Sequence, residues 1–384
     1  MGQTVRVTVK PQMIRWARER AGVRLEDLLH TFPKLKAWEL GEERPTLRQL
    51  EEFARQVRVP LGYLFLDTPP EESLPIPDFR TMTGPPRRPS PDLLDTIYLA
   101  QQRQAWYREY LQTQGAEPLP FVGSTALQDD PEEVAATIRR ILGLDLEERR
   151  TMRTWTEALR RLIEQAESVG VLVMSSGIVG MNTRRKLDPE EFRGFALVDD
   201  LAPVVFINAA DTVAARTFTL AHELAHIWLG QSGISNPQIH VFPTEATERW
   251  CNRVAAELLV PRVSLLAEHR STHPLQEEAQ RLARLFKVST LVILRRLHEV
   301  GRLSRKAFWE IYREECERLR DMERRTGIGG DFYRNLYARV SRPLVEAVVI
   351  STLEGHTLYR DAYRLLGIRS PEVFQKLCRS LGVA

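Results

Sequence analysis

Apolar residues recur at helical spacing along most of the chain, first within residues 11–66. Glycine and proline residues divide this part into short amphipathic segments, namely "MIRWARERAG", "RLEDLLHTF", "KLKAWELGEERP", "TLRQLEEFARQV" and "PLGYLFLD". Thr46 opens the fourth segment and Gln49 follows three residues later, which is the spacing of a helix-capping box. The pattern therefore predicts a compact bundle of five short helices.

The helical pattern stops after this bundle and returns beyond a proline-rich stretch. Residues 68–92 read "TPPEESLPIPDFRTMTGPPRRPSPD", and their proline content predicts an extended linker rather than a helix. Residues 93–165 then carry one long, polar helical pattern and two shorter ones. We therefore expect a helical connecting region there.

The period of the pattern changes at Val171. The runs "VLVMSS", "FRGFALVDD" and "PVVFINAA" are short, rich in β-branched and aromatic residues, and bounded by turn residues, so they predict strands. A strongly apolar helix should begin near Asp211 or Thr212. A loop of roughly 15–20 residues and a second amphipathic helix, halted by Pro261, follow. The remainder, to Ala384, is almost entirely helical in pattern.

Composition places the chain among soluble globular proteins. Of its 384 residues, 43% are hydrophobic and 27% are charged, and the longest apolar runs are far shorter than a bilayer span. The N-terminus lacks the apolar core of a secretory signal, so we expect a cytoplasmic protein. The net charge of +3 gives no general attraction to nucleic acid, and any DNA contact would have to come from a local surface.

The three cysteines do not form a recognisable site. Cys251, Cys316 and Cys378 are odd in number, widely spaced and outside any CxxC pattern. Their arrangement fits a reducing compartment and argues against a disulfide framework or a zinc site built from thiolates.

The candidate chemistry lies in "TFTLAHELAHIWLG", residues 217–230. His222 and His226 are four residues apart, so a helix places both imidazoles on one face, where they can bind one ion. Glu223 points about 100° around the helix, too far to be a third ligand, but it can reach a water bound to the metal. This is the division of labour in HExxH zinc proteases.

Two features distinguish this pentapeptide from a chance match, which two free positions out of five make common. The helix around it is strongly apolar, so burying one glutamate and two histidines there would be costly without a function. The strand "PVVFINAA" directly precedes it, in the place of the edge strand that positions a peptide substrate in such proteases.

A water-binding zinc site needs a third protein ligand, and four downstream residues are candidates: His240, Glu245, Glu248 and Glu257. Glu248 is one helical turn from Asn252, so Glu248 could bind the metal while Asn252 accepts the free N–H of a metal-bound imidazole. Glu257 should lie on roughly the opposite face of this helix and form a salt bridge. We favour Glu248, with Glu245 as the second choice.

With these residues in view, the chain resembles the ImmA/IrrE family of zinc metallopeptidases. "RTFTLAHELAHIWLG" and "EATERWCNRVAAELLVP" match its two signatures, except that Cys251 and Val254 stand where alanine and phenylalanine are usual. The resemblance implies Zn²⁺ as cofactor, Glu248 as third ligand, and an α+β zincin-like peptidase domain with a small mixed β-sheet over residues 166–304. A helical C-terminal region, 305–384, would follow. Members of the family cleave repressor proteins.

The N-terminal segments, residues 1–67, resemble the helix-turn-helix domain of the XRE type. Lys34, Lys36 and Arg24 are the candidate DNA contacts. Acidic neighbours such as Glu39 and Glu43 dilute the positive field, and the turn before the recognition helix looks short. A protein-interaction role for this domain therefore stays open beside DNA binding.

Residues 279–304 also have helix-turn-helix spacing, with Ser289 as an N-cap. In proteins of the ImmA/IrrE type, such a segment packs under the peptidase, and we expect a structural role here. Arg295 and Arg296 should form a solvated face, and His298 should be a surface residue rather than a ligand.

Together these patterns predict a mainly α, multidomain protein with a gluzincin-like endopeptidase. The ImmA/IrrE resemblance implies that it cleaves one regulatory protein, of the repressor type. The N-terminal domain would bind operator DNA through residues 11–66 or serve regulation in another way. The alternative is a regulator that does not cut, with a structural zinc site. Relatives with "PIPDFRT" and an XRE unit resemble antitoxin-like partners of PIN-domain toxins, so such a toxin is a candidate partner.

Overall fold

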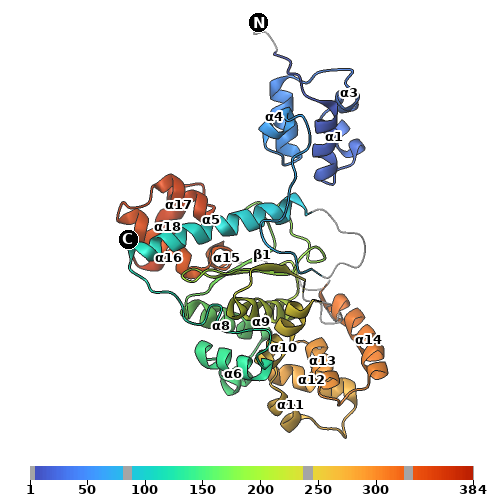
Figure 1. Cartoon of the computed structure of the whole chain (residues 1–384), viewed down its shortest axis with the longest axis vertical. Helices are drawn as coiled ribbons and strands as arrows, with labels where there is room; N and C mark the ends of the chain where they lie inside the picture. Colours follow the sequence, from blue (N-terminus) through green and yellow to red (C-terminus); the bar gives the residue numbers. More distant parts are fainter. Residues whose placement is uncertain (1–4, 81–88, 237–244, 324–331, 384) are drawn as a thin grey trace. The chain divides into compact units, whose positions relative to one another are not determined.

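A computed structural model describes residues 5–80, 89–236, 245–323 and 332–383. The chain divides into two compact units, which are described separately below. The first comprises residues 1–75 and 86–95, and the second comprises residues 76–85 and 96–384. Helices predominate, and the strands form one small mixed sheet (Figure 1).

The first unit contains the predicted short helices. They are α1 (Pro11–Arg20), α2 (Leu25–Leu29), α3 (Leu35–Leu40), α4 (Leu47–Gln56) and the 3₁₀ helix η1 (Leu61–Phe65). Trp38 and Phe53 are the largest side chains that are fully buried in their common core. The predicted capping box is present, because Thr46 accepts from the backbone N–H of Gln49 while the Gln49 side chain accepts from that of Thr46. The fifth predicted helix is a 3₁₀ helix, which follows Pro60.

The sheet lies in the second unit and has the order β1-β3-β2-β4. Its strands are β1 (Leu172–Ser176), β2 (Gly194–Leu197), β3 (Val204–Asn208) and β4 (Gly233–Ser235). β1 pairs with β3 in parallel, whereas β2 pairs antiparallel with both β3 and β4. All four strands are buried throughout.

The sheet order corrects the sequence analysis on the edge strand. The run "PVVFINAA" contains β3, which lies inside the sheet between β1 and β2. The strand at the edge beside β2 is β4, within the stretch that was predicted to be a loop. A strand of three residues is too short to show a period of two, and the crossover that places β3 inside is a long-range pairing without a local signal.

Helices cover the sheet on both faces, as Figure 1 shows. On one face lie α8 (Trp155–Ser168) and α9 (Val213–Leu229); on the other lie α5 (Pro91–Thr113) and α15 (Phe332–Val340). Gln104 of α5 donates two hydrogen bonds from its amide group, to the backbone carbonyls of Leu197 and Ala202. Such burial on both faces explains why the strand sequences are apolar runs instead of alternating patterns.

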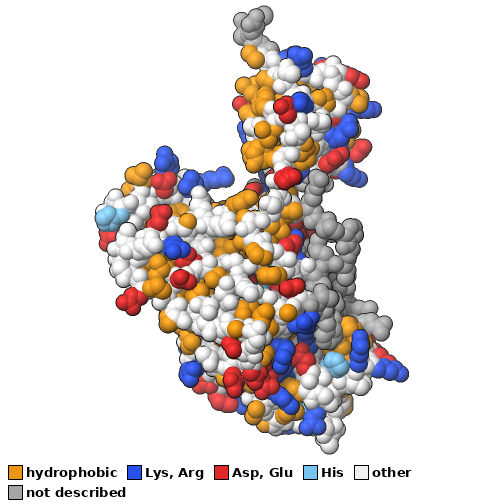
Figure 2. All heavy atoms as spheres, in the orientation of Figure 1, with side chains coloured by type: hydrophobic (Ala, Val, Ile, Leu, Met, Phe, Trp, Pro, Cys, Tyr) orange, Lys and Arg blue, Asp and Glu red, His pale blue; other side chains and the backbone are white. Residues whose placement is uncertain are grey.

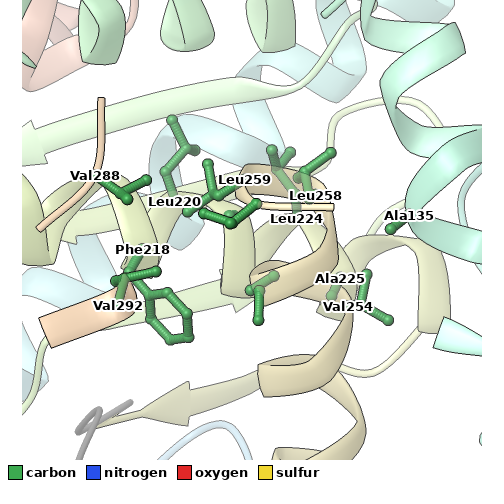
Figure 3. Packing of buried hydrophobic residues seen from close by; sticks show 14 of the residues in the cluster. Ala135, Phe218, Leu220, Leu224, Ala225, Val254, Leu258, Leu259, Val288 and Val292 are labelled. Atoms are coloured by element: carbon green, nitrogen blue, oxygen red, sulfur yellow. The ribbon is translucent and has the colours of Figure 1, made fainter. Parts of the chain in front are cut away.

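The largest core forms between α9 and α10 (Ala246–Leu259), with α6 (Pro131–Leu142) packed against α10. Figure 3 shows Leu220 and Leu224 of α9 beside Leu258 and Leu259 of α10, and Ala135 of α6 next to them. This packing fixes the mutual position of the two helices that carry the candidate metal ligands.

The remaining helices complete the second unit. They are α7 (Leu146–Thr151), α11 (Arg262–Glu268), α12 (Leu275–Phe286), α13 (Thr290–Glu299), α14 (Arg305–Glu323), α16 (Arg342–Leu353), α17 (Tyr359–Leu366) and α18 (Pro371–Leu381). Residues of α12 and α13 belong to the same core as α9, and Ser289 caps α13 as predicted. No helix among the described residues has both the length and the apolar character needed to cross a membrane.

The predicted solvated face of α13 is wrong. Arg295 and Arg296 are 6% and 5% exposed, and both pair with Glu299, while Arg296 also pairs with Glu257. These acidic partners compensate the charge of the buried guanidinium groups. The prediction was wrong because it assumed that charged side chains are exposed. His298 is half-buried, and its Nδ1 bonds to the carbonyl of Leu303.

Candidate metal centre

Helix α9 carries the "HELAH" sequence through the middle of the core. Thr212 caps its first turn by accepting from the backbone N–H of Ala215, and Gly230 ends it in the left-handed conformation with φ 73°. Every residue from Thr217 to Leu229 is buried. This part of the helix is therefore buried on every side, and the side chains of His222, Glu223 and His226 are surrounded by protein.

The structure brings His222, His226 and Glu248 together. The Nε2 atoms of the two histidines are 3.1 Å apart. Glu248, in the first turn of α10, places Oε1 3.1 Å from Nε2 of His226 and Oε2 3.3 Å from Nε2 of His222. One ligand atom from each residue lies within 4.8 Å of the others, and all three side chains are buried.

Two neighbouring residues hold this cluster in place. Asn252, one turn after Glu248, accepts a hydrogen bond at Oδ1 from the Nδ1–H of His222, at 3.2 Å. This bond leaves the Nε2 lone pair of His222 directed at the cluster. Ser235 of β4 has its hydroxyl 3.3 Å from Nε2 of His226 and 3.4 Å from Oε1 of Glu248. Sequence reasoning missed Ser235, because nothing local links this short strand to the helix.

Burial and charge act differently on the ionisable groups of the cluster. Burial raises the pKa of Glu223 well above its usual value, and the neighbouring Glu248 carboxylate raises it further. Burial also opposes ionisation of Glu248, but the two histidines outweigh it and lower its pKa to about 2. Burial lowers the pKa of His226, which favours the neutral imidazole that binds metals.

These groups fit a divalent metal ion. Two imidazole nitrogens and one carboxylate oxygen are the donor set of water-binding zinc sites. Among the described residues, no lysine or arginine forms an ion pair with Glu223 or Glu248, and the partners of Glu248 are the two histidines. Ser235 is the polar neighbour of Glu223, whose two oxygens make no well-formed hydrogen bond within the described part of the chain. Buried groups of this kind are costly unless an ion or water satisfies them.

Gly194 of β2 makes room for Glu223. A Cβ at this position would lie 2.9 Å from Oε1 of Glu223, 2.6 Å from Cγ2 of Thr219 and 2.8 Å from the carbonyl oxygen of Phe206. Only a residue without a side chain lets the strand approach the helix this closely. Sequence analysis did not identify this glycine, since its role depends on a contact between two elements.

The other candidate ligands lie elsewhere. Glu257 forms an ion pair with Arg296 and accepts from the backbone N–H of Arg262, in line with its expected place on the far face of α10. Glu245 is the exposed N-cap residue of α10. His240 lies outside the described residues.

An aromatic residue from the predicted linker lies against the cluster. The ring of Phe79 stacks on the imidazole of His226, with centroids 5.7 Å apart and planes inclined by 13°. In the sequence, Phe79 falls within the proline-rich stretch that predicts a linker, and no local signal connects it with the site.

The candidate DNA contacts of the first unit are largely neutralised within it. Lys34 pairs with Glu43 at 2.7 Å, and Arg24 pairs with Asp27 at 2.9 Å, whereas Lys36 is exposed. Figure 2 shows basic and acidic side chains interspersed on the visible face of this unit. Helix α3, the predicted recognition helix, has only six residues and no side-chain cap.

Comparison with known proteins identifies two regions of the chain. Residues 166–298 match the model of the Peptidase_M78 family, described as IrrE N-terminal-like domain, which supports the ImmA/IrrE resemblance and a peptidase activity of the metal-dependent type. Residues 340–380, which include α16, α17 and most of α18, match a domain of unknown function, DUF8813. No curated protein and no solved structure matches the chain. The matched peptidase region contains the sheet, the HExxH helix and the helix that carries Glu248.

Proposed function

We propose that the protein is a zinc-dependent endopeptidase of the gluzincin type. The observation that carries this proposal is the convergence of His222, His226 and Glu248 in a buried cluster, next to a buried glutamate, Glu223, that has no lysine or arginine partner among the described residues. The match of the surrounding region to a peptidase family agrees with it.

Each residue has a definite role in this proposal. His222, His226 and Glu248 hold the metal, and Asn252 fixes the ring of His222 in the tautomer whose Nε2 can bind. A bound zinc ion would polarise the scissile carbonyl and make a water molecule more acidic. Glu223 takes the proton of the attacking water on its carboxylate and can deliver it to the leaving amine.

The substrate that we propose is a regulatory protein of the repressor type, which the ImmA/IrrE resemblance implies. The N-terminal unit would then couple cleavage to operator DNA or to another partner. Because most of its predicted DNA contacts are engaged in ion pairs, a role in protein recognition is an equal part of this proposal.

The test separates metal binding from cleavage. Protein with Glu223→Gln should keep stoichiometric zinc by elemental analysis and should capture its substrate from a lysate of the source cells without cutting it. Adding wild-type protein should cleave the captured partner at one site, which mass spectrometry of the fragments locates. Glu245→Gln, an exposed change at the start of α10, is the matched control and should cut normally. A wild-type protein without zinc, or equal cleavage by the Glu223→Gln form, contradicts the proposal.

A regulator that does not cut is the second candidate. The contact of Phe79 with His226 favours it, because the ring covers one face of a candidate metal ligand. In this case zinc would be structural, and the body of the protein would bind a partner such as a PIN-domain toxin. Glu223 discriminates the two functions, since a structural site has no use for it. An unchanged cellular phenotype of the Glu223→Gln strain would show that proteolysis is not the function.

A further inference from the structure

The short segment that carries Phe79 pairs with the edge of the sheet. Ile234 of β4 donates its backbone N–H to the carbonyl of Pro77 at 2.9 Å, and Phe79 donates its own to the carbonyl of Ile234 at 3.0 Å. The segment runs parallel to β4, with Asp78 opposite Ile234. Residues 76–80 therefore act as a further strand beside β4, on the side away from β2.

The ring of Phe79 occupies a slot formed by Gly233 and His226. It stacks on the imidazole of His226, and a Cβ at position 233 would lie only 2.3 Å from the ring carbons. Gly233 thus lets an aromatic side chain lie flat against the strand. The same slot would accept an aromatic side chain of any extended peptide laid along β4.

Arg80 fixes the end of the segment. Its guanidinium is 2% exposed and makes two bonds of 2.7 Å to the carboxylate of Asp78, and it donates to the backbone carbonyl of Glu191 at 3.3 Å. The neighbouring residues Pro77 and Asp78 are exposed. Two backbone bonds, one ring contact, the buried side chain of Ile76 and one anchored arginine hold the segment. A competing strand would have to replace these contacts.

An exposed edge strand binds extended peptides through backbone hydrogen bonds, with pockets selecting alternate side chains. We infer that the outer edge of β4 is a peptide-binding site with a slot for an aromatic residue, and that residues 76–80 occupy it as an internal ligand. A peptide substrate must displace this segment before it can reach the cluster. The inference rests on the proposed peptidase function, because it takes the peptide that binds at the edge of β4 to be the substrate.

The position of the segment in the chain suits a regulatory role. Residue 76 follows directly on the last residue of the first stretch of the N-terminal unit. A partner that binds the N-terminal unit and pulls on the segment that follows it would remove Phe79 from its slot. The segment competes at the high effective concentration of a tethered ligand, so an untethered peptide needs such assistance or a better fit.

A labelled peptide tests the site without requiring zinc or cleavage. The probe is fluorescein-labelled LPIPDFR, the chain's own residues 74–80, with a scrambled peptide as its control. By fluorescence anisotropy, Phe79→Ala protein should bind the probe about tenfold or more tightly than wild type, because its internal ligand has lost the ring. Phe65→Ala removes an exposed phenylalanine of the other unit and should bind like wild type.

A second variant and a second measurement guard against loss of folding. Asp78→Ala leaves Phe79 in place but releases Arg80, so it should show an intermediate gain in probe affinity. Hydrogen exchange of the Ile234 amide should accelerate in both variants, while their melting temperatures stay near that of wild type. Equal probe affinity in wild type and folded Phe79→Ala, or binding by neither, overturns the inference.

The outcomes also separate this inference from the proposed function. Suppose that wild type and Phe79→Ala cleave the captured partner equally fast and bind the probe equally well. The peptidase function is then supported, and the role of residues 76–80 as an internal ligand is contradicted. If neither wild type nor any variant cleaves a partner but the probe binds more tightly to Phe79→Ala, the peptide-binding site is supported and the catalytic role is contradicted.

Discussion

The N-terminal unit and the candidate metal centre treat charge differently. In the N-terminal unit, acidic and basic side chains pair with one another, both where they are largely buried, as in Arg18–Glu39, and at the surface, as in Lys34–Glu43. In the centre between α9 and α10, the carboxylates of Glu223 and Glu248 are buried without any lysine or arginine partner among the described residues. The candidate centre differs in that the buried carboxylate of Glu248 is paired with histidines, which can also bind a metal ion, rather than with lysine or arginine.

The largest effect that we expect is the loss of metal when the third candidate ligand, Glu248, is removed. Glu248→Ala removes one of three donors, so we expect zinc affinity to fall by more than about 100-fold and stoichiometric metal to be lost on desalting. Elemental analysis measures the outcome. The matched control Glu245→Ala changes an exposed carboxylate on the same helix and should retain metal. Full zinc content in the Glu248→Ala protein would falsify the assignment of the third ligand.

Glu167 of the second unit offers a comparison, because this half-buried carboxylate accepts hydrogen bonds and interacts with the charge of Arg342. Glu167 of α8 accepts from the hydroxyl of Ser341 and the backbone N–H of Arg342, and burial raises its pKa to about 7. The folded state then binds the proton more tightly than the unfolded state, so wild-type stability is greatest below the unfolded pKa and falls as pH rises to about 7.

Glu167→Gln keeps the acceptor oxygen but removes this titration. We expect it to raise the free energy of unfolding by about 2–3 kcal/mol at pH 8 and to change little at pH 4. Urea unfolding at both pH values measures the difference. An equal effect at both pH values would mean that the charge of Glu167 is not the cause.

The next largest effect is expected on stability, where Gly194 of β2 lies close to Glu223. Gly194→Ala forces a Cβ against a side-chain methyl group, a backbone carbonyl and the carboxylate, which should cost about 1–3 kcal/mol of stability. Gly62 of η1 has no atom within 4 Å of the same imaginary Cβ, and Gly62→Ala should be close to neutral. Thermal unfolding of both variants tests whether space around Glu223, rather than glycine loss in general, matters.

The smallest effect is expected at the surface of the N-terminal unit. Lys34→Ala breaks the ion pair with Glu43, in which the lysine side chain is 53% exposed, and should change the free energy of unfolding by less than about 1 kcal/mol. A loss of 2 kcal/mol or more, measured by urea unfolding, would remove the contrast between the two units.

Features that depend on neighbouring residues in the sequence could be predicted, and features that depend on distant contacts could not. Helical periodicity placed His222 beside His226 and Asn252 one turn from Glu248, and the structure brings all four together. The capping box at Thr46 and the mainly helical architecture follow from equally local rules.

The misses share a long-range origin. β3 lies inside the sheet because of a crossover, and β4 is too short to be read from its pattern. Arg296 is buried where it meets Glu257 and the carbonyl of Val260 at the end of α10, a contact between distant parts of the sequence. Phe79 was read as part of a linker because its partners, Gly233 and His226, are far along the chain.

The pairing of residues 76–80 with β4 has a consequence for biosynthesis. The ribosome makes this segment long before β4, so the cover for the sheet edge already exists when that edge first forms. Exposed edges invite other chains to add strands, and nascent proteins are most vulnerable while such edges lack a partner. The order in which the chain is synthesised would therefore protect it from aggregation.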